Sequence, residues 1–379
     1  MAHIALEKIE KTFGKVQALK GVDLEVRDKE FFVLFGPAGA GKTTILKTVA
    51  GIEFPERGLV RFDGEIVNLV EPSARNVSMV FENYALYPHM TVFDNIASPM
   101  RSPRYKESEE TIREKVQKVA DMMGIGHLMD RLPSQLSNGQ RQRTALGRCL
   151  VRSPKVFLMD EPLAHLDAKL RHLMRTELKA MQAQFDTTTI YVTHDYTEAM
   201  SLGDRVGILN EGKIVQIGSG DAIYYTPANE FVAKLVGEPE INLMDAEFVT
   251  EEGELKVRLD EAPQLFPVPT DVAAVLRDNY DSVKKWRVGV RGTNIPHSFE
   301  PQLTSLEGVV YNLEPIGNKS ILTVKVGERL YQSVAKNDMK AELDTRIYLE
   351  PDITHALFFN GDTGQFVTRH NQAELLQGR

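Results

Sequence analysis

The sequence predicts an α/β domain with a parallel sheet, followed by a smaller domain made of β-strands. In residues 1–235, short apolar runs alternate with segments whose apolar residues recur at helical spacing, as in a sheet covered by helices on both faces. After about residue 235 the pattern changes to short alternating runs separated by Gly, Asn and Asp, which is typical of a small barrel. We therefore expect two domains, at 1–235 and 236–379.

The first domain begins with strands and then a strand–loop–helix unit. Residues 4–9 and 18–26 alternate as strands do, with a turn at 13–15 between them. The apolar run at 31–35 predicts a buried strand, and the helical spacing at 44–50 predicts the helix that follows the next loop.

The middle of the first domain is expected to be mainly helical. Short strands are predicted at 58–64 and 77–81, and the pattern then turns helical from about 91 to 150. Helices are predicted at 107–123 and 140–151, the second ending before a Ser-Pro pair.

The alternating pattern returns before the second domain. An almost wholly apolar run at 156–159 predicts a buried strand, residues 169–184 a helix, and residues 188–192 another strand. The short strands expected in the second domain lie at 255–259, 288–290, 308–311, 320–326 and 346–349.

Composition fits a globular protein with a full core. Of 379 residues, 42% are hydrophobic and 26% are charged, and the net charge of −8 argues against a broad nucleic-acid-binding face. The single cysteine, Cys149, allows no intrachain disulfide and is expected to be a small core residue in a reducing compartment. The first residues lack the pattern of a signal peptide, and no apolar run approaches the ~18 residues of a membrane span. A role at a membrane would therefore need another chain to cross it.

The loop after residue 35 has the spacing of a phosphate-binding P-loop. Its residues are Gly36-Pro37-Ala38-Gly39-Ala40-Gly41-Lys42-Thr43. Glycines let the backbone wrap tightly enough to aim N–H groups at nucleotide phosphates. Lys42 adds a charge toward the β- and γ-phosphates, and Thr43 can place its hydroxyl on Mg²⁺. We expect this run, together with Thr44, to bind the nucleotide.

Two acids, Asp160 and Glu161, follow the apolar run at 156–159. In P-loop folds a carboxylate at this strand end lies beside Mg²⁺, so Asp160 is the candidate metal ligand. Glu161 is then placed to polarise the attacking water as a general base. The alternative, a pair of acids in an ordinary loop, is disfavoured by the P-loop and by the buried strand before them.

A third motif predicts the start of a helix. Ser137, followed three residues later by Gln140, forms a capping box. The free N–H groups and the positive dipole end of such a helix suit a phosphate. By itself, however, this run is explained better by an ordinary helix start with nothing bound.

Together these motifs resemble those of the ATP-binding cassette (ABC) ATPases. The signature of that family is Leu-Ser-Gly-Gly-Gln, and this chain has Leu136-Ser137-Asn138-Gly139-Gln140. The order also matches, from P-loop through aromatic-rich loop, signature, acid pair and Asp loop to a switch histidine. The implied fold is a cassette with a mixed sheet and a helical subdomain at about 88–152, followed by a small OB-like regulatory domain.

The resemblance also implies roles for single residues. His194, which follows the strand predicted at 188–192, corresponds to the histidine that senses the γ-phosphate and would be catalytic together with Lys42 and Glu161. Asp167 lies in the Asp loop near the nucleotide. Phe13 falls where the family stacks an aromatic ring on adenine.

A closer resemblance is to the maltose-type subgroup, which powers sugar and polyol importers. Residues 81–92 nearly match the subgroup's loop between catalytic core and helical part, and residues 166–171 match its Asp loop. Transmembrane permease subunits are therefore the expected partners, with an extracytoplasmic substrate-binding protein acting indirectly and no nucleic acid. The expected location is peripheral, at the cytoplasmic face of the inner membrane. A sugar, a polyol or glycerol 3-phosphate are all open as substrates.

Three positions depart from the family pattern. Glu82 stands where the family usually has Gln; an ionised Glu only accepts hydrogen bonds, although it can still ligand Mg²⁺. Asn138 replaces a glycine, and we expect it to be tolerated because Asn adopts left-handed backbone angles better than most residues. Ala164-His165 replaces the usual Ser-x and removes a hydroxyl. These changes are expected to affect turnover more than nucleotide binding.

The implied mechanism needs two cassettes, paired head to tail. Residues 137–140 of one would face the P-loop, Asp160, Glu161 and His194 of the other across ATP, and closure would complete the catalytic group. The second ATPase subunit is an identical chain or a different one, since Asn138 would occupy both sites of a homodimer and one site of a heterodimer. Two other readings stay open: a soluble cassette ATPase of DNA repair or translation, and a weakly hydrolytic subunit of an asymmetric pair.

Overall fold

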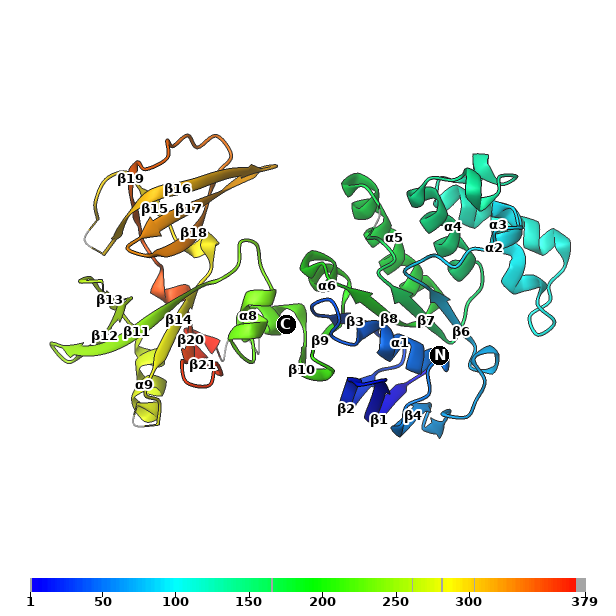
Figure 1. Cartoon of the computed structure of the whole chain (residues 1–379), viewed down its shortest axis with the longest axis horizontal. Coiled ribbons are helices and arrows are strands. Elements are labelled where there is room, and N and C mark those ends of the chain that lie inside the picture. The colour runs from blue at the N-terminus through cyan, green and yellow to red at the C-terminus, as the bar shows by residue number, and fades with distance from the viewer. Residues whose placement is uncertain (1, 165, 261, 281, 303, 373–379) are drawn as a thin grey trace. The chain divides into compact units, whose positions relative to one another are not determined.

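The computed structural model divides into two compact units, Met1–Gly220 and Asp221–Arg379, which are described separately below (Figure 1). The residues described are 2–164, 166–260, 262–280, 282–302 and 304–372, without the side chains of 181–185. His165 therefore lies outside the described residues.

A six-stranded sheet forms the centre of the first unit, in the order β10-β9-β3-β8-β7-β6. Five strands are parallel, and β10 pairs antiparallel with β9, so the sheet is mixed as the resemblance implied. The strands are β3 (Phe31–Phe35), β6 (Val77–Val80), β7 (Val156–Asp160), β8 (Thr188–Thr193), β9 (Arg205–Asn210) and β10 (Lys213–Gly218). Every residue of β3, β7 and β8 is buried, which confirms the buried strands predicted from their apolar runs.

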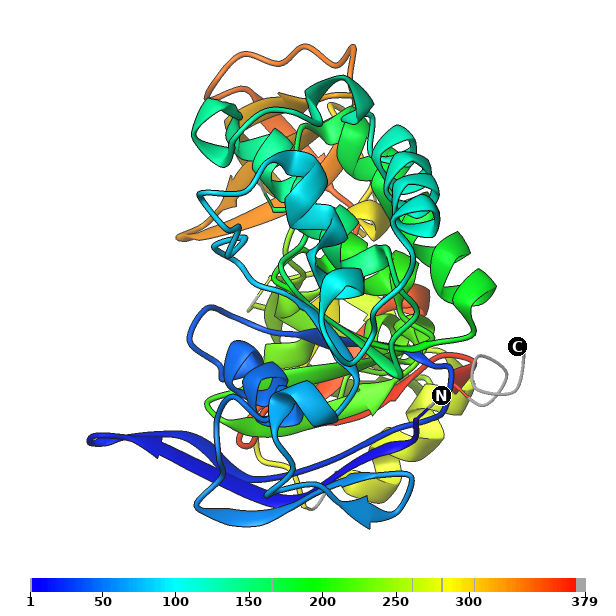
Figure 2. The same ribbon diagram turned by 90° about the vertical axis from the view of Figure 1, so that its right-hand side faces the viewer.

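A second sheet of the first unit is antiparallel, in the order β2-β1-β4-β5. Its strands are β1 (Ile4–Phe13), β2 (Val16–Val26), β4 (Arg57–Phe62) and β5 (Glu65–Ile66). The hairpin of β1 and β2 is long, and Figure 2 shows it extending to a turn at its tip. Apolar residues of this sheet, of the central sheet and of the first helix form one continuous core.

Helices cover the central sheet and fill the segment between β6 and β7. The α-helices are α1 (Lys42–Ala50), α2 (Val92–Ala97), α3 (Glu109–Met122), α4 (Asn138–Leu150), α5 (Ala168–Phe185) and α6 (Tyr196–Leu202). Short 3₁₀ turns occur at η1 (Pro72–Ala74), η2 (Ser98–Arg101), η3 (Gly126–Leu128) and η4 (Pro133–Gln135). Helices α2, α3 and α4 contact one another and form a helical subdomain in the first unit. Cys149 of α4 is buried as expected, and burial raises the pKa of its thiol to about 12.

The P-loop helix α1 is closed at its far end by a buried cation, Arg75. The Arg75 guanidinium donates to the carbonyl oxygens of Thr48 and Val49 in the last turn of α1, at 3.0 and 2.9 Å. It also donates to the carbonyl oxygens of Val67, Asn68 and Val70, all in the segment just before Arg75. Because helix C-termini leave carbonyls without intrahelical partners, Arg75 supplies the donor for the Val49 carbonyl, while the Thr48 carbonyl also accepts from the Gly51 N–H.

Replacing Arg75 with Met is expected to lower the free energy of unfolding by about 2–4 kcal/mol, because several buried carbonyls lose their donor at once. Urea denaturation at pH 7 measures the loss. The control is Arg57→Met, because the Arg57 side chain is 79% exposed and its removal should change stability little. Equal losses in both variants would contradict the role given to Arg75.

The second unit consists mainly of two antiparallel sheets, in the orders β13-β12-β11-β14-β20-β21 and β15-β19-β16-β17-β18. Residues from both sheets share one core, as expected of an OB-like domain. The first sheet holds β11 (Asn242–Glu251), β12 (Glu254–Leu259), β13 (Leu265–Pro267), β14 (Trp286–Val290), β20 (Leu357–Asn360) and β21 (Phe366–Arg369). The second holds β15 (His297–Ser298), β16 (Leu306–Ile316), β17 (Lys319–Val326), β18 (Arg329–Lys336) and β19 (Arg346–Leu349).

Helices also occur in or at the edge of the second unit: α7 (Gly220–Tyr225), α8 (Glu230–Leu235), α9 (Thr270–Asn279) and the 3₁₀ turns η5 (Gly292–Asn294) and η6 (Ile353–His355). Arg291 joins α7 and α8 to the strands, since its guanidinium donates to the Tyr224 carbonyl at 2.7 Å and to the Val236 carbonyl at 2.5 Å. Among the described residues of the whole chain, no helix is both long and apolar enough to span a membrane.

Candidate functional site

The P-loop connects β3 to α1 and depends on two of its glycines. A Cβ on Gly36 would lie 2.1 Å from the Leu209 carbonyl oxygen, so only glycine fits there. Gly41 has φ +108, and a Cβ on it would lie 2.8 Å from the Ala18 carbonyl oxygen. Between them, Ala38 and Gly39 are exposed, which leaves the outer face of the loop open to a ligand. Thr44 is half-buried in the first turn of α1.

Lys42 lies under the P-loop with only 6% of its surface exposed. Its Nζ donates to the carbonyl oxygens of Gly36 and Pro37, both at 2.9 Å. Burial lowers the pKa of Lys42, while the charges of nearby acids, Glu161 first, act in the opposite direction. The ammonium group is thus held against the carbonyls of the loop, and its predicted contact with the β- and γ-phosphates stays a prediction.

Thr43 and Asp160 meet although they are far apart in the sequence. The Thr43 hydroxyl donates to the Asp160 carboxylate at 3.0 Å. Asp160 is 3% exposed, and burial raises its pKa to about 6, with smaller contributions in the same direction from the charges of Glu82 and Glu161. A carboxylate and a hydroxyl side by side are hard oxygen donors of the kind that Mg²⁺ prefers.

These oxygens do not form a complete metal cage. Within the described parts of the chain, no group of three or more His, Cys, Asp and Glu side chains could hold a metal ion by itself. This fits Mg²⁺, which in nucleotide sites takes one or two protein ligands and completes its shell with water and phosphate. Glu82 is exposed, and its charge raises the pKa of both Lys42 and Asp160, so it faces the same site.

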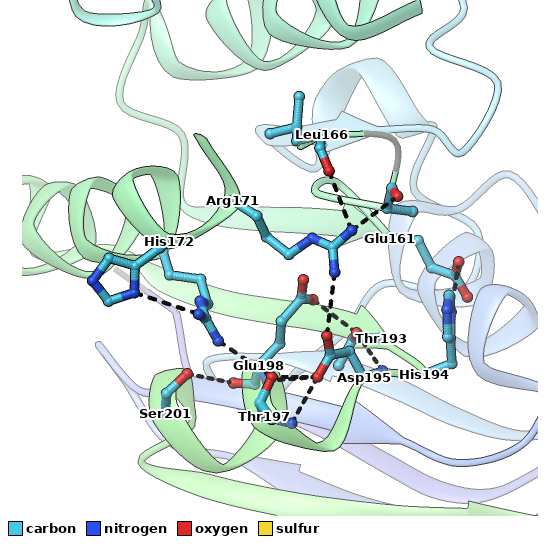
Figure 3. Close-up of polar contacts among 12 residues, drawn as sticks. Glu161, Leu166, Arg171, His172, Thr193, His194, Asp195, Thr197, Glu198 and Ser201 are labelled. Atoms are coloured by element: carbon cyan, nitrogen blue, oxygen red, sulfur yellow. Dashed lines mark hydrogen bonds and ion pairs between the residues drawn. The ribbon is translucent and has the colours of Figure 1, made fainter. Parts of the chain in front are cut away.

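Glu161 and His194 form the second pair of the site (Figure 3). His194 Nδ1 lies 3.0 Å from Glu161 Oε2, and the imidazole is the more exposed partner. Glu161 follows β7 in a left-handed conformation, φ 47, which turns its side chain out of the strand direction. A cavity of about 40 Å³, lined by both side chains, has room for water beside the carboxylate.

A network of polar side chains lies next to the Glu161–His194 pair (Figure 3). Asp195 caps α6 by accepting from the backbone N–H of Thr197 at 2.7 Å, and it forms an ion pair with Arg171 at 3.6 Å. Arg171 also donates to the carbonyl of Leu166, the first residue of the Asp loop, at 3.2 Å. The sequence analysis did not single out Arg171, because its role depends on a contact between α5 and the start of α6.

Glu198 is a second residue that the sequence analysis missed. It is 3% exposed and accepts from the Tyr191 hydroxyl and the Thr193 hydroxyl, both at 2.8 Å. Burial raises the pKa of Tyr191 well above its ordinary value, with the Glu198 charge adding to the effect. Through these hydrogen bonds the buried Glu198 fixes the end of β8, and His194 follows directly after that strand.

The capping box is confirmed at the start of α4. The Ser137 hydroxyl accepts from the Gln140 N–H at 3.3 Å, and the Gln140 side chain accepts from the Ser137 N–H at 2.9 Å. Asn138 is the first helical residue and has no left-handed backbone, so the reason we gave for its tolerance was wrong: this position makes no demand for glycine. The described residues show no hydrogen bond or ion pair from 137–140 to the P-loop or to the acid pair of the same chain.

Two other predicted residues lie apart from these contacts. Phe13 ends β1 near the hairpin tip with 44% of its surface exposed, and Lys11 Nζ lies 5.1 Å from its ring centroid. Asp167 precedes α5, where its carboxylate accepts from the Leu170 N–H at 2.9 Å. The structure thus brings together Lys42, Thr43, Asp160, Glu161 and His194, with Glu82 facing them.

Comparison with known proteins decides the family. The family model for ABC transporters matches residues 19–164. The trehalose/maltose import ATP-binding protein MalK of Thermococcus litoralis is 40% identical, over 97% of this chain and 100% of that protein. The chain belongs to the ABC transporter ATP-binding family. This ABC protein is therefore a nucleotide-binding ATPase, as its motifs predicted.

Other similarities agree with this family. The sn-glycerol-3-phosphate import ATP-binding protein UgpC of Rhodopseudomonas palustris is 49% identical, over 69% of this chain and 74% of that protein. Among solved structures, a dimeric post-hydrolysis state of the cassette MJ0796 bound to ADP and Pi matches with a TM-score of 0.54 and 28% identity. That alignment covers 57% of the ABC protein and 98% of the MJ0796 chain.

Proposed function

We propose that this ABC protein is the ATP-hydrolysing subunit of a membrane importer for a sugar, a polyol or a glycerol phosphate. The proposal is supported by relatives named as import ATP-binding proteins for trehalose/maltose and for sn-glycerol-3-phosphate. The observation that carries it is the grouping of the P-loop lysine with the Thr43–Asp160 and Glu161–His194 pairs. Transport itself would be done by permease subunits in the membrane.

In this proposal the P-loop and its neighbours hold Mg–ATP. Backbone N–H groups of 36–44 bind the phosphates, and the Lys42 ammonium, now bonded to loop carbonyls, turns to the β- and γ-phosphates. Thr43 and Asp160, with Glu82 as a further donor, would hold Mg²⁺. The bound ion supplies positive charge that offsets charge developing on the phosphates. Phe13 stacks on the adenine ring.

Hydrolysis in this proposal depends on Glu161 and His194. Glu161 orients a water and accepts its proton as that water attacks the γ-phosphate. His194, at 3.0 Å, holds the carboxylate in place and contacts the γ-phosphate through its exposed face. The Arg171–Asp195 ion pair fixes the segment that carries His194.

A second cassette completes the site in this proposal. The N-terminus of α4, with Ser137, Asn138, Gly139 and Gln140, has no phosphate to bind within its own chain and would meet the ATP held by its partner. The dimeric MJ0796 cassette bound to ADP and Pi supports such a pairing. Native mass spectrometry of the assembled complex distinguishes two identical chains from an asymmetric pair.

The permease is proposed to dock in a groove of about 480 Å³ in the first unit. The groove is lined by residues of β6, of the loop after it, in and just after η2, and in and just after α4: Val77, Ser78, Met79, Phe81, Ala85, Tyr87, Ser98, Pro99, Ser102, Arg148, Cys149 and Arg152. Its mixed apolar and cationic lining and the exposed Tyr87 ring suit a short helix of a membrane partner. Docking there would hold the protein peripherally at the cytoplasmic face of the inner membrane, with an extracytoplasmic binding protein delivering substrate indirectly.

Replacing Tyr87 with Ala is expected to weaken permease binding and substrate uptake at least about tenfold, because an exposed aromatic anchor is lost. Basal ATP hydrolysis of the isolated chain should stay within about twofold of the wild type, because Tyr87 makes no contact with the acid pair. Co-purification with the solubilised permease and uptake into proteoliposomes measure the two effects. The exposed Tyr280 of the second unit provides the control, Tyr280→Ala.

Permease binding and transport that persist in the Tyr87→Ala variant would contradict the docking site. A wild-type chain that co-purifies with no membrane protein would contradict the importer function as a whole.

A further inference from the structure

The loop after β6 contains two consecutive non-glycine residues with left-handed backbones, Tyr84 at φ 63 and Ala85 at φ 43. Such conformations are unfavourable and persist only when neighbouring groups hold them. We refer to residues 84–87 as the aromatic loop. Both left-handed residues are bound by one side chain, Arg148, near the C-terminus of α4.

Arg148 grips the aromatic loop through three contacts. Its Nη1 donates to the Ala85 carbonyl at 2.9 Å and its Nη2 to the Tyr84 carbonyl at 3.0 Å. Its guanidinium carbon lies 5.2 Å from the centroid of the Tyr87 ring. The guanidinium therefore binds both left-handed residues and the exposed ring with one rigid group.

These contacts are the main compensation for a half-buried charge. Within the described part of the chain, Arg148 forms no ion pair with a carboxylate, and partial burial lowers its pKa. A cation in this position is stabilised by carbonyl dipoles and the ring, so the loop and the side chain depend on each other. Arg148 therefore differs from an ordinary basic residue on a helix surface, whose charged group is surrounded by water.

The far end of the aromatic loop is also held by the helical subdomain. Asn95 of α2 is fully buried; its amide oxygen accepts from the Tyr87 N–H at 2.8 Å, and its amide nitrogen donates to the Tyr87 carbonyl at 3.1 Å. Helices α2 and α4 pack against each other. Glu82 and Asn83, between the loop and the central sheet, are exposed.

We propose that Arg148 is a positioning residue that makes the aromatic loop and α4 move as one body. The other end of α4, about 20 Å away for 13 residues, is the capped run Ser137–Gln140. A displacement of the aromatic loop is therefore carried along α4 to the residues proposed to meet the partner's ATP. A displacement of those residues is likewise carried back to the loop. The use of this link in transport rests on the proposed function, but the link itself does not.

Hydrogen exchange on the full purified chain tests the link without any permease. The chain carries Glu161→Gln so that ATP persists, and exchange is followed with and without Mg–ATP. With Arg148 present, ATP is expected to slow exchange both at 137–141 and at 84–87. With Arg148→Gln added, exchange at 84–87 should be about tenfold faster and insensitive to ATP, while 137–141 still responds.

The matched control is Arg143→Gln. Arg143 lies on the same helix, but donates to the carbonyls of Met123 and Gly139 and not to the loop. This variant should keep the response of the aromatic loop to ATP. Arg148→Lys, which keeps the charge with a single donor group, should restore part of it.

Two results would overturn the proposal. One is an unchanged ATP response of 84–87 in the Arg148→Gln variant. The other is faster exchange spread equally over α2 and α4, which would make Arg148 merely a stabiliser of the subdomain. If the exchange results hold while Tyr87→Ala leaves permease binding untouched, the docking site fails and the link stands.

Discussion

Replacing Glu161 with Gln is expected to lower ATP hydrolysis about 10²–10⁴-fold while ATP binding is retained. Gln keeps the shape of Glu161, but its amide cannot accept a proton from water. The amide can still reach His194, whose Nδ1 lies 3.0 Å from the carboxylate in the wild type. Phosphate release at saturating ATP measures the loss, and equilibrium binding of ATP measures what is kept.

An exposed acid provides the control for this experiment. Glu110 lies on the surface of α3, and Glu110→Gln should hydrolyse ATP like the wild type. If Glu161→Gln also hydrolysed normally, Glu161 would not be the general base. If wild type and variant released phosphate equally slowly, the chain would be the weakly hydrolytic subunit of an asymmetric pair.

Replacing Asp160 with Asn is expected to abolish most hydrolysis and yet stabilise the nucleotide-free chain at neutral pH. Burial raises the pKa of Asp160 to about 6, above the ~3.9 of an unfolded Asp. Between these values the folded chain holds a proton that the unfolded chain has lost. Stability contributed by this group is therefore complete below pH ~4 and is lost as pH rises through about 6.

At pH 7.5 the ionised, buried Asp160 costs about 3 kcal/mol by this linkage, which Asn does not incur. Urea denaturation without nucleotide should therefore show Asp160→Asn to be more stable at pH 7.5, with the advantage largely gone at pH 4.5. Asp130→Asn, at an exposed acid, should show no such pH dependence. An advantage of equal size at both pH values would mean that Asp160 is not held in a destabilising ionised state.

Mg–ATP should act oppositely on the two chains. Because Asp160 is proposed to hold the ion, Mg–ATP is expected to stabilise the wild type strongly and Asp160→Asn weakly. A thermal shift of equal size in both would contradict the proposed metal ligand. Without nucleotide, the ionised Asp160 lowers the stability of the folded chain. Binding of Mg–ATP at this carboxylate would offset that loss of stability.

Motifs that are continuous in the sequence could be assigned from the sequence alone. The P-loop, the acid pair at the end of β7 and the capping box of Ser137 and Gln140 each depend on spacing within a few residues, and the structure shows each in its expected local form. The strand–helix alternation likewise predicted β3, α1, β6, β7, α5 and β8, but not β9, β10 or α6. Helix α9 was not predicted either, because the sequence on either side of it has the alternating pattern of strands and the whole second unit was interpreted as β-strands.

Side chains whose function depends on a distant contact could not be assigned in this way. Arg75, Arg148 and Arg171 look like ordinary basic residues in the sequence. Arg75 and Arg148, however, bind backbone carbonyls in another segment, and Arg171 forms an ion pair with Asp195. In the sequence Glu198 is simply a residue on a helix, but in the structure its carboxylate is buried and accepts hydrogen bonds from two hydroxyl groups. The helical backbone of Asn138, by contrast, follows from the predicted capping box, which makes Ser137 the N-cap, although the helix was predicted only from residue 140.

The sequence by itself determined which chemical groups this ABC protein carries and where they fall along strands and loops, because local spacing sets local conformation. Only the tertiary structure decided how far the pKa values of these groups shift and which groups contact each other. Examples are the raised pKa of Asp160, the short distance between Glu161 and His194, and the hydrogen bonds from Arg148 to the aromatic loop. The reason is physical, since desolvation and hydrogen bonding depend on what covers a group, and the covering residues come from elsewhere in the chain.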